Sequence, residues 1–153
     1  MVVRLLEIST GEVTQTFVRY ARVKRADTTS LDGKLRAEVS DSRVVKLWNI
    51  IPGEAFRTLE GHSDQITDVD FSPDGDLLAS ASKDKTVRLW DTSIRPALPS
   101  LDVHRDYVTI LNFSPDGKYL ASGANDCTVI SWDTNDGLLR TFSGHSGRNF
   151  LAR

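Results

Sequence analysis

Hydrophobic and polar residues alternate along this chain in short runs that polar turns separate. Residues 66–72 alternate in this way and place Val69 and Phe71 on one face of a predicted strand. The segment SPDG at 72–75 then predicts a tight turn, because proline fixes φ and glycine accepts a left-handed backbone. Residues 77–82 are mostly apolar, which predicts a second strand that is buried on both faces.

A third and a fourth strand complete this unit. Residues 86–91 predict a strand with Val87 and Trp90 on opposite faces. An outer strand is predicted at 97–101, and its counterpart in the next unit at 138–142. Short, evenly spaced strands that alternate with turns are typical of an all-β fold.

The unit occurs again after 42 residues. Residues 62–93 and 104–135 are identical at 17 of 32 positions when they are aligned at this offset without a gap. The same offset leads from Trp90 back to Trp48 and forward to Trp132, so the period extends beyond the two segments. A self-similar period of about 40 residues indicates an array in which each repeat is one supersecondary unit.

The motifs GH, SPDG, LAS-x-x-x-D and TV-x-LWD follow one another within one such unit. This order resembles the WD40 repeat, a β-propeller blade of four antiparallel strands. The resemblance is specific from Leu59 to Phe142 and weaker before Leu59. It implies an all-β fold, namely a partial β-propeller of about three blades with half-blades at the ends.

The resemblance divides the chain as a single WD40 repeat domain. Its expected parts are two strands of a degenerate blade (1–18), a degenerate blade (19–60), two regular blades (61–102 and 103–143) and a truncated start (144–153). The chain holds 153/42 ≈ 3.6 units, whereas propellers close with about 4–8 blades. It is therefore expected to be part of a longer propeller protein, a truncated gene product, or a chain that self-associates through open blade edges.

The resemblance also implies a structural network of histidine, serine, aspartate and tryptophan in each regular blade. Its residues are His62, Ser80, Asp84 and Trp90 and, 42 positions later, His104, Ser122, Asp126 and Trp132. The chemistry of such a network is general. A serine hydroxyl can accept the indole N–H and donate to one histidine nitrogen, while the other nitrogen donates to the aspartate. Each buried polar group then has a partner.

Serine, histidine and aspartate are also the residues of a hydrolase triad. Here they recur once per unit, each time with a tryptophan, and no G-x-S-x-G segment surrounds Ser80 or Ser122. We therefore expect no catalytic residues, with an enzyme that uses a blade-surface site as an alternative. The histidines belong to the repeat, and no zinc spacing, phosphate loop or dinucleotide fingerprint occurs, so we expect neither metal nor cofactor.

The unit before residue 60 departs from the pattern. Tyr20, Glu38 and Ser42 stand where the network histidine, serine and aspartate are expected, and only the tryptophan is kept, as Trp48. Asp41 lies one position away and could replace the missing aspartate in part. This unit is therefore expected to be the least protected part of the array.

Two further features are interpreted conservatively. A run of basic residues, Arg19, Arg22, Lys24 and Arg25, is interpreted as a solvated face of a degenerate strand. A patch that binds phosphate or an acidic peptide is the alternative. Cys127 stands in a predicted tight turn and is interpreted as a small polar filler, because nothing in the sequence activates it as a nucleophile.

Composition excludes several classes of protein. The 153 residues are 39% apolar and 26% charged, which is typical of a globular chain. The net charge of −2 supplies no basic field for nucleic acid, and no apolar run reaches the roughly 20 residues of a membrane span. A single cysteine excludes an intramolecular disulfide and favours an intracellular location, cytoplasmic or nuclear.

The resemblance implies a non-catalytic scaffold for protein–protein interaction, with other proteins or peptides as partners. A truncated remnant without an autonomous function is the alternative. The expected contact surface is formed by the loops before each first strand and the turns before each third strand. Its candidate residues are Asp64, Gln65, Lys83, Asp106, Tyr107 and Asn125. Tyr107 is the expected anchor, because aromatic side chains dominate binding hot spots.

Overall fold

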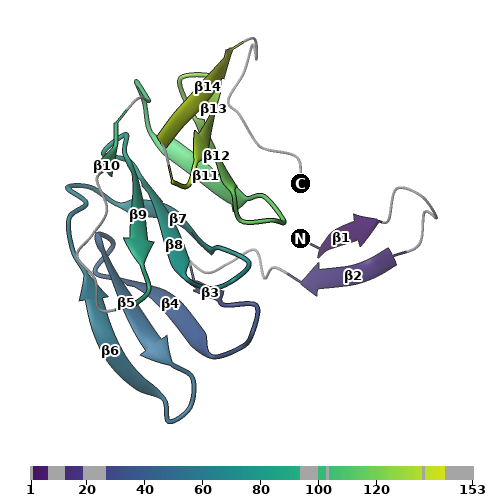
Figure 1. Cartoon of the computed structure of the whole chain (residues 1–153). Coiled ribbons are helices and arrows are strands. Elements are labelled where there is room, and N and C mark those ends of the chain that lie inside the picture. Colours follow the sequence, from purple (N-terminus) through teal and green to yellow (C-terminus); the bar gives the residue numbers. More distant parts are fainter. Residues whose placement is uncertain are drawn as a thin grey trace.

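The computed structural model describes residues 2–6, 13–18, 27–93, 100–102, 104–135 and 137–143. Every regular element within these ranges is a β-strand, and none is a helix. The strands form three four-stranded antiparallel sheets and one separate hairpin (Figure 1). The predicted all-β fold, a partial propeller of four-stranded sheets, is therefore confirmed.

Each four-stranded sheet is a meander in which consecutive strands are hydrogen-bonded neighbours. The first sheet contains β3 (Asp27–Thr29), β4 (Leu35–Ser40), β5 (Val44–Asn49) and β6 (Glu54–Leu59). The second sheet contains β7 (Ile66–Phe71), β8 (Leu77–Ser82), β9 (Val87–Asp91) and β10 (Ser100–Leu101). The third sheet contains β11 (Val108–Phe113), β12 (Tyr119–Ala124), β13 (Thr128–Asp133) and β14 (Gly137–Ser143). The hairpin pairs β1 (Val2–Leu6) with β2 (Val13–Val18).

The strands lie close to their predicted positions. The prediction for β8 matches the observed bounds, and β9 begins one residue later than predicted. The outer strand β14 extends one residue beyond the predicted range at each end. Of the outer strand predicted at 97–101, residues 100 and 101 form β10, and the first three residues lie outside the described residues.

The same side chains build the turn between the first two strands of each sheet. In the second sheet the Ser72 hydroxyl accepts the Leu77 N–H at 2.9 Å and donates to the carboxylate two residues later at 2.5 Å. Gly75 ends this turn at φ = 80°, a left-handed conformation that favours glycine. Ser30 and Ser114 make the equivalent contacts, so the turn persists in the first sheet, where the proline is missing.

The sheets pack face to face, and the two interfaces between them form the core. The first interface buries Ala37, Val39, Val45, Leu47 and Leu59 with Ile66, Val69, Phe71, Leu78 and Trp90. The second interface buries Ala79, Ala81, Val87 and Leu89 with Val108, Leu111, Phe113, Leu120, Ile130 and Trp132. In both, a surface of smaller aliphatic side chains meets one that carries phenylalanine and tryptophan. Small side chains opposite large ones let two packed layers interdigitate.

Carboxylates also join the second sheet to the third. β11 is an edge strand, and the N–H groups on its free side need partners other than a neighbouring strand. Asp68 on β7 accepts the Leu111 N–H at 3.0 Å, and Asp70 accepts the Phe113 N–H at 3.2 Å. Hydrogen bonds to charged acceptors are stronger than neutral ones, so these two contacts fix the position of one sheet against the other.

The connections between strands lie at two opposite ends of the sheets. We call the end with the β4–β5, β6–β7, β8–β9, β10–β11 and β12–β13 connections the loop face. We call the end with the β3–β4, β5–β6, β7–β8 and β11–β12 turns the turn face. On the loop face, the Ile66 N–H donates to the Ser42 carbonyl of the neighbouring sheet at 2.6 Å. Loops that are distant in sequence are therefore presented side by side.

Candidate functional site

The four network residues of the second sheet lie in one hydrogen-bonded chain. Trp90 Nε1–H donates to the Ser80 hydroxyl at 2.8 Å, and Ser80 lies 2.8 Å from His62 Nε2. His62 Nδ1 lies 2.8 Å from Asp84 Oδ2. A carboxylate can only accept, so Nδ1 carries a proton, and in the neutral imidazole Nε2 then accepts from the serine hydroxyl. The chain links the β6–β7 loop, β8, the β8–β9 turn and β9.

The third sheet repeats this arrangement with one difference. Trp132 Nε1–H donates to Ser122 at 2.8 Å, and Ser122 lies 2.8 Å from His104 Nε2. His104 Nδ1, however, lies 3.4 Å from Asp126 and 3.1 Å from the hydroxyl of Thr128. In the second sheet the order is reversed, because the Thr86 hydroxyl lies 3.3 Å from His62 Nδ1 and the aspartate is closer.

Thr86 and Thr128 are members of the two networks that sequence reasoning missed. The Thr86 hydroxyl donates to Asp84 at 2.7 Å, and the Thr128 hydroxyl donates to its aspartate at 2.5 Å. Asp84 also accepts the backbone N–H groups of Ser63 and Thr86, each at 3.0 Å. One carboxylate thus holds the loop before the first strand against the turn before the third. Both threonines are identical in the two repeats, which is the signal that could have revealed them.

The burial of these networks shifts the pKa values of their titratable groups. Burial lowers the pKa of His62 and of His104 below the ordinary value of 6.5, although the neighbouring carboxylates oppose this shift. Burial alone would raise the pKa of Asp84, but hydrogen bonds from Thr86 and His62 hold it below the ordinary value of 3.8. Neutral histidine and ionised aspartate are therefore the favoured forms near neutral pH.

Among the residues that the structure describes, the first sheet lacks this network. Trp48 is retained, but its buried Nε1–H has no hydrogen-bond partner in the described part of the chain. Glu38 stands at the serine position on β4, and Ser42 at the aspartate position is exposed. Asp41 is exposed as well and does not replace the missing aspartate within the described residues. Tyr20, which stands at the histidine position, lies outside the described residues.

The loop face brings several candidate partner-binding residues together at the second interface. Tyr107 is 41% exposed, and Lys83 Nζ lies 5.9 Å from the centre of its ring. This cation–π contact joins a turn of the second sheet to a loop of the third. The Asn125 N–H donates to the Tyr107 carbonyl at 2.9 Å, just as the Lys83 N–H donates to Gln65 at 2.9 Å. The backbone under the aromatic side chain is therefore fixed.

The two acidic candidates hold the loops before β7 and β11 in the same way. Asp64 accepts the N–H of Gln65 at 2.6 Å, and Asp106 accepts the N–H of Tyr107 at 2.7 Å. The Asp64 carbonyl also accepts the hydroxyl of Ser82 at 3.0 Å. Asp64 itself is exposed, so its carboxylate is accessible to a partner on the loop face.

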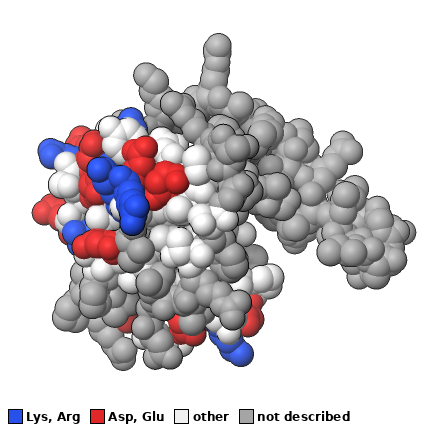
Figure 2. Space-filling view, turned by 90° about the horizontal axis from the view of Figure 1, so that it is seen from above, with Lys and Arg blue, Asp and Glu red and all other residues white. Residues whose placement is uncertain are grey.

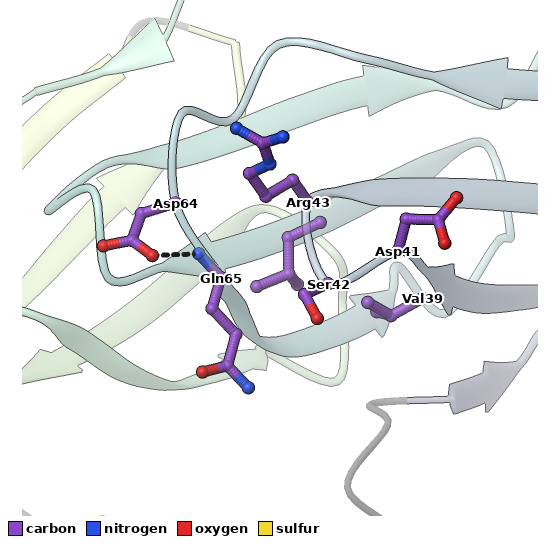
Figure 3. A pocket seen from close by; sticks show the side chains of 7 residues that line it. Val39, Asp41, Ser42, Arg43, Asp64 and Gln65 are labelled. Carbon is purple, nitrogen blue, oxygen red and sulfur yellow. Dashed lines mark hydrogen bonds between the residues drawn. The ribbon is translucent and has the colours of Figure 1, made fainter.

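A cleft of about 610 Å³ opens on the loop face at the first interface (Figure 3). Its lining residues are Val39, Asp41, Ser42, Arg43, Asp64, Gln65 and Ile66. Asp41 and Ser42 have φ angles of 51° and 63°, so two consecutive residues of the β4–β5 turn are left-handed. The equivalent turns of the other sheets have one left-handed residue each, Lys85 and Cys127. This local difference, which the hydrophobic pattern does not reveal, brings Arg43 to the same cleft as Asp64.

Comparison with known families gives a match for the repeats. A family model described as "WD domain, G-beta repeat" matches residues 53–91 and 96–133, together just over half of the chain. The chain belongs to the WD40-repeat family. A search of curated proteins found no match. The predicted family is therefore confirmed, with a partial array of repeats.

Each matched WD40 repeat spans two sheets of the structure. The match at 53–91 begins in the β5–β6 turn and contains β6 of the first sheet with β7, β8 and β9 of the second. The match at 96–133 contains β10 of the second sheet with β11, β12 and β13 of the third. Across the first interface, the Arg57 guanidinium of β6 donates to the Asp91 carbonyl at 2.6 Å. The sequence repeat thus connects adjacent sheets both covalently and by hydrogen bonds.

WD40 domains are typically non-catalytic scaffolds, and their repeats generally mediate protein–protein interaction. Within the described residues, no helix is long and apolar enough to span a membrane. The basic residues Arg19, Arg22, Lys24 and Arg25 lie outside the described residues, so the structure does not address that patch. Cys127 occupies the left-handed position of its turn and is half-buried.

Proposed function

We propose that this WD40 protein is a non-catalytic platform that binds another protein or a peptide across its loop face. The supporting observation is the pairing of Tyr107 with Lys83 beside the loop of Asp64 and Gln65. An exposed aromatic ring on a hydrogen-bonded loop loses little conformational entropy when it is buried by a partner. We propose Tyr107 as the anchor, and Asp64, Gln65, Lys83, Asp106 and Asn125 as the surrounding polar contacts.

The cleft at the first interface extends this surface. Arg43 and Asp64 both line it and carry opposite charges (Figure 3). A peptide that crosses from the cleft to Tyr107 would meet two acidic groups, Asp41 and Asp64, and one basic group, Arg43, before it reaches the ring. Charges at the edge of an interface set the orientation and the association rate of a partner more than its affinity. We therefore propose that the cleft orients the peptide and that Tyr107 supplies affinity.

The buried position of the network serines favours a scaffold over an enzyme. Ser80 and Ser122 are each 0% exposed, and each accepts a tryptophan N–H. A nucleophilic serine must reach the reacting atom of its substrate. Neither hydroxyl meets this condition, so we assign both to the architecture of the sheets.

The distribution of charge favours a protein partner over nucleic acid. Acidic and basic side chains lie interspersed on the face that is seen from above (Figure 2). Non-specific nucleic-acid binding depends on a patch of Lys and Arg that neutralises several phosphates. We therefore propose protein partners for the loop face.

We also propose an intracellular location, because the sequence has a single cysteine, which is half-buried, and does not use disulfides.

A peptide selection tests the loop-face proposal. Peptides selected for binding from a random display library are synthesised, and their affinities are measured with the wild-type protein and with Tyr107→Ala. We expect Tyr107→Ala to weaken binding by about tenfold or more, since truncation of a hot-spot residue costs at least about 1–2 kcal/mol. Lys83→Ala is expected to have a smaller effect, because the cation–π contact is exposed.

Tyr119→Ala is the matched control. Tyr119 is 44% exposed, close to the value for Tyr107, but it stands at the start of β12 on the turn face. We expect this variant to bind the selected peptides as the wild type does. Equal affinities for Tyr107→Ala and wild type, or selection of no peptide at all, would contradict a peptide-binding loop face.

A further inference from the structure

The cleft at the first interface combines a buried apolar base with a charged rim. Its lining residues Val39 and Ile66 are 3% and 4% exposed, so they lie at its base. Asp41, Arg43 and Asp64 also line it and are exposed to solvent. Figure 3 shows Asp41 and Arg43 on the β4–β5 turn and Asp64 on the loop before β7. An occupant therefore meets aliphatic side chains below and charged groups near the surface.

An apolar base beneath two carboxylates matches the shape and chemistry of a long basic side chain. Lysine and arginine pack their aliphatic stems on apolar surface and keep their charged heads near water. Here the stem would pack on Val39 and Ile66, and the head would reach Asp41 and Asp64 at the rim. The volume of about 610 Å³ lies within the range of about 300–1,000 Å³ that is usual for ligand clefts.

The groups that remain available in the cleft are mainly acceptors. The Gln65 N–H donates to Asp64 at 2.6 Å, and the Ile66 N–H donates to the Ser42 carbonyl at 2.6 Å, so both backbone donors are already used. Within the described ranges, the second carboxylate oxygen of Asp64 and both carboxylate oxygens of Asp41 accept no hydrogen bond. Loops that bind anions do so with backbone N–H groups. The cleft is therefore better suited to a donor with a positive charge.

The second interface shows a lysine at the corresponding place. At the offset of 42, Asp41 corresponds to Lys83 and Gln65 corresponds to Tyr107. The Lys83 side chain crosses from the second sheet to the third, where its Nζ lies 5.9 Å from the centre of the Tyr107 ring. The first interface has a carboxylate in place of this lysine and an amide in place of the ring. It has exchanged a basic side chain of its own for an acidic one.

We propose that the cleft binds one lysine or arginine side chain of the peptide partner, whose charged head is held by Asp41 and Asp64. The proposal rests on the peptide-binding role of the loop face and names the residue type that the peptide places in the cleft. Arg43 restricts the cleft to a single basic side chain, because a second one would meet a like charge.

Other occupants fit the cleft less well. An acidic side chain that paired with Arg43 would lie beside the carboxylates of Asp41 and Asp64, which repel it. Ca²⁺ takes about six to eight oxygen ligands. Among the residues that the structure describes, no group of three or more acidic, histidine or cysteine side chains is placed to hold a metal ion.

Peptide selections on two forms of the protein test the proposal. Peptides are selected from a random display library in parallel on the wild type and on Asp41→Asn combined with Asp64→Asn. Asparagine keeps the size of each side chain, can accept the Gln65 N–H, and tolerates the left-handed φ of 51° at position 41. We expect lysine or arginine to be enriched at one position of the peptides selected on the wild type, and not on the double variant.

Affinity measurements then locate the basic residue in the cleft. A peptide selected on the wild type is compared with a copy that carries methionine in place of the basic residue. Asp41→Asn and Asp64→Asn should each weaken the basic peptide by about two- to fivefold and leave the methionine peptide unchanged, and higher salt should reduce the difference. Arg43→Ala should bind the basic peptide equally or more tightly. Asp76→Asn, which removes an exposed charge on the turn face, is the matched control and should have no effect.

Tyr107→Ala, measured with the same peptides, separates this proposal from the function on which it rests. Peptides that depend on Tyr107 but show no basic preference, or that bind the double variant as tightly as the wild type, would overturn the cleft proposal alone. Enrichment of aspartate or glutamate that Arg43→Ala abolishes would assign the cleft to an acidic side chain instead. Selection of no peptide would overturn this proposal together with the peptide-binding function.

Discussion

The first and second sheets have the same strand order and the same turn chemistry, yet they differ in how their polar groups are satisfied. In the second sheet, Trp90 donates its indole N–H to a serine that is itself bonded to a histidine. In the first sheet, Trp48 occupies the same position, and its buried N–H has no partner among the described residues. A buried polar group without a hydrogen bond costs about 1–3 kcal/mol. The comparison shows that the strand pattern suffices for the fold, and we predict that the network determines how firmly each sheet is held.

The largest expected effect comes from the tryptophans. Trp90→Ala should lower the free energy of unfolding by about 3–5 kcal/mol, because it deletes a large buried side chain and leaves Ser80 without its donor. Trp48→Ala should cause a smaller loss, since this side chain is only half-buried and its N–H makes no hydrogen bond within the part of the chain that the structure describes. Denaturant titration of both variants checks this order. Equal losses for the two would remove the distinction between the sheets.

The next effect concerns the network carboxylate. Asp84→Ala should cost about 1–3 kcal/mol, because it leaves a histidine nitrogen and two backbone N–H groups without an acceptor. Ser42→Ala is the matched variant in the first sheet, where the side chain is exposed, and should change stability by less than about 0.5 kcal/mol. Thermal melting of Asp84→Ala and Ser42→Ala compares the carboxylate position of the second sheet with that of the first. A large loss in Ser42→Ala would reveal a second network that the first sheet is not expected to have.

A smaller effect is expected on acidification. The pKa values of His62 and His104 are lower in the folded protein than the ordinary 6.5, so the unfolded chain binds protons more readily as the pH falls. Their contribution to stability is present above about pH 6.5 and is lost as the pH falls toward their folded pKa values. The depressed pKa of Asp84 removes further stability below about pH 4.

Melting curves recorded from pH 8 to pH 4 measure this dependence, and His62→Gln supplies the control. The variant should be less stable than the wild type at pH 8 and should show a weaker loss between pH 6.5 and pH 5. Stability that rises as the pH falls through this window would mean that the histidines are charged in the folded state, which would contradict the neutral tautomer assigned from their partners.

Much of the fold could be predicted because the repeat supplies several copies of the same information. The turn residues that Ser72 begins and the spacing from Ser80 to Trp90 recur at an offset of 42, so strands, turns and network residues could be located before any contact was known. Hydrogen bonds within one repeat depend on residue type and spacing alone. For this reason Ser80 lies between His62 and Trp90, in the order that the chemistry of their donors and acceptors suggests.

The features that could not be predicted are those in which one repeat differs from the next. Asp68 and Asp70 cap the edge of β11, but Ile110 and Asn112 occupy the equivalent positions of the third sheet, so no pattern marks them. The cleft depends on the backbone of the β4–β5 turn, where two consecutive residues are left-handed. The exposed side chains of Leu31, Ile50 and Ile51 are visible in sequence only as departures from the proline, threonine and serine of the second sheet.

Amide hydrogen exchange under native conditions tests the central claim most directly, namely that the hydrogen-bonded networks make the second and third sheets more stable than the first. The amides of β4 and β5 are compared with those of β8 and β9, which have the same places in their sheets. We predict that β8 and β9 exchange more slowly, by about tenfold or more. Among the described residues, the first sheet contains one buried N–H without a hydrogen bond, that of Trp48, and such a group costs about 1–3 kcal/mol. Equal protection of the two pairs of strands, or slower exchange in β4 and β5, would contradict this account.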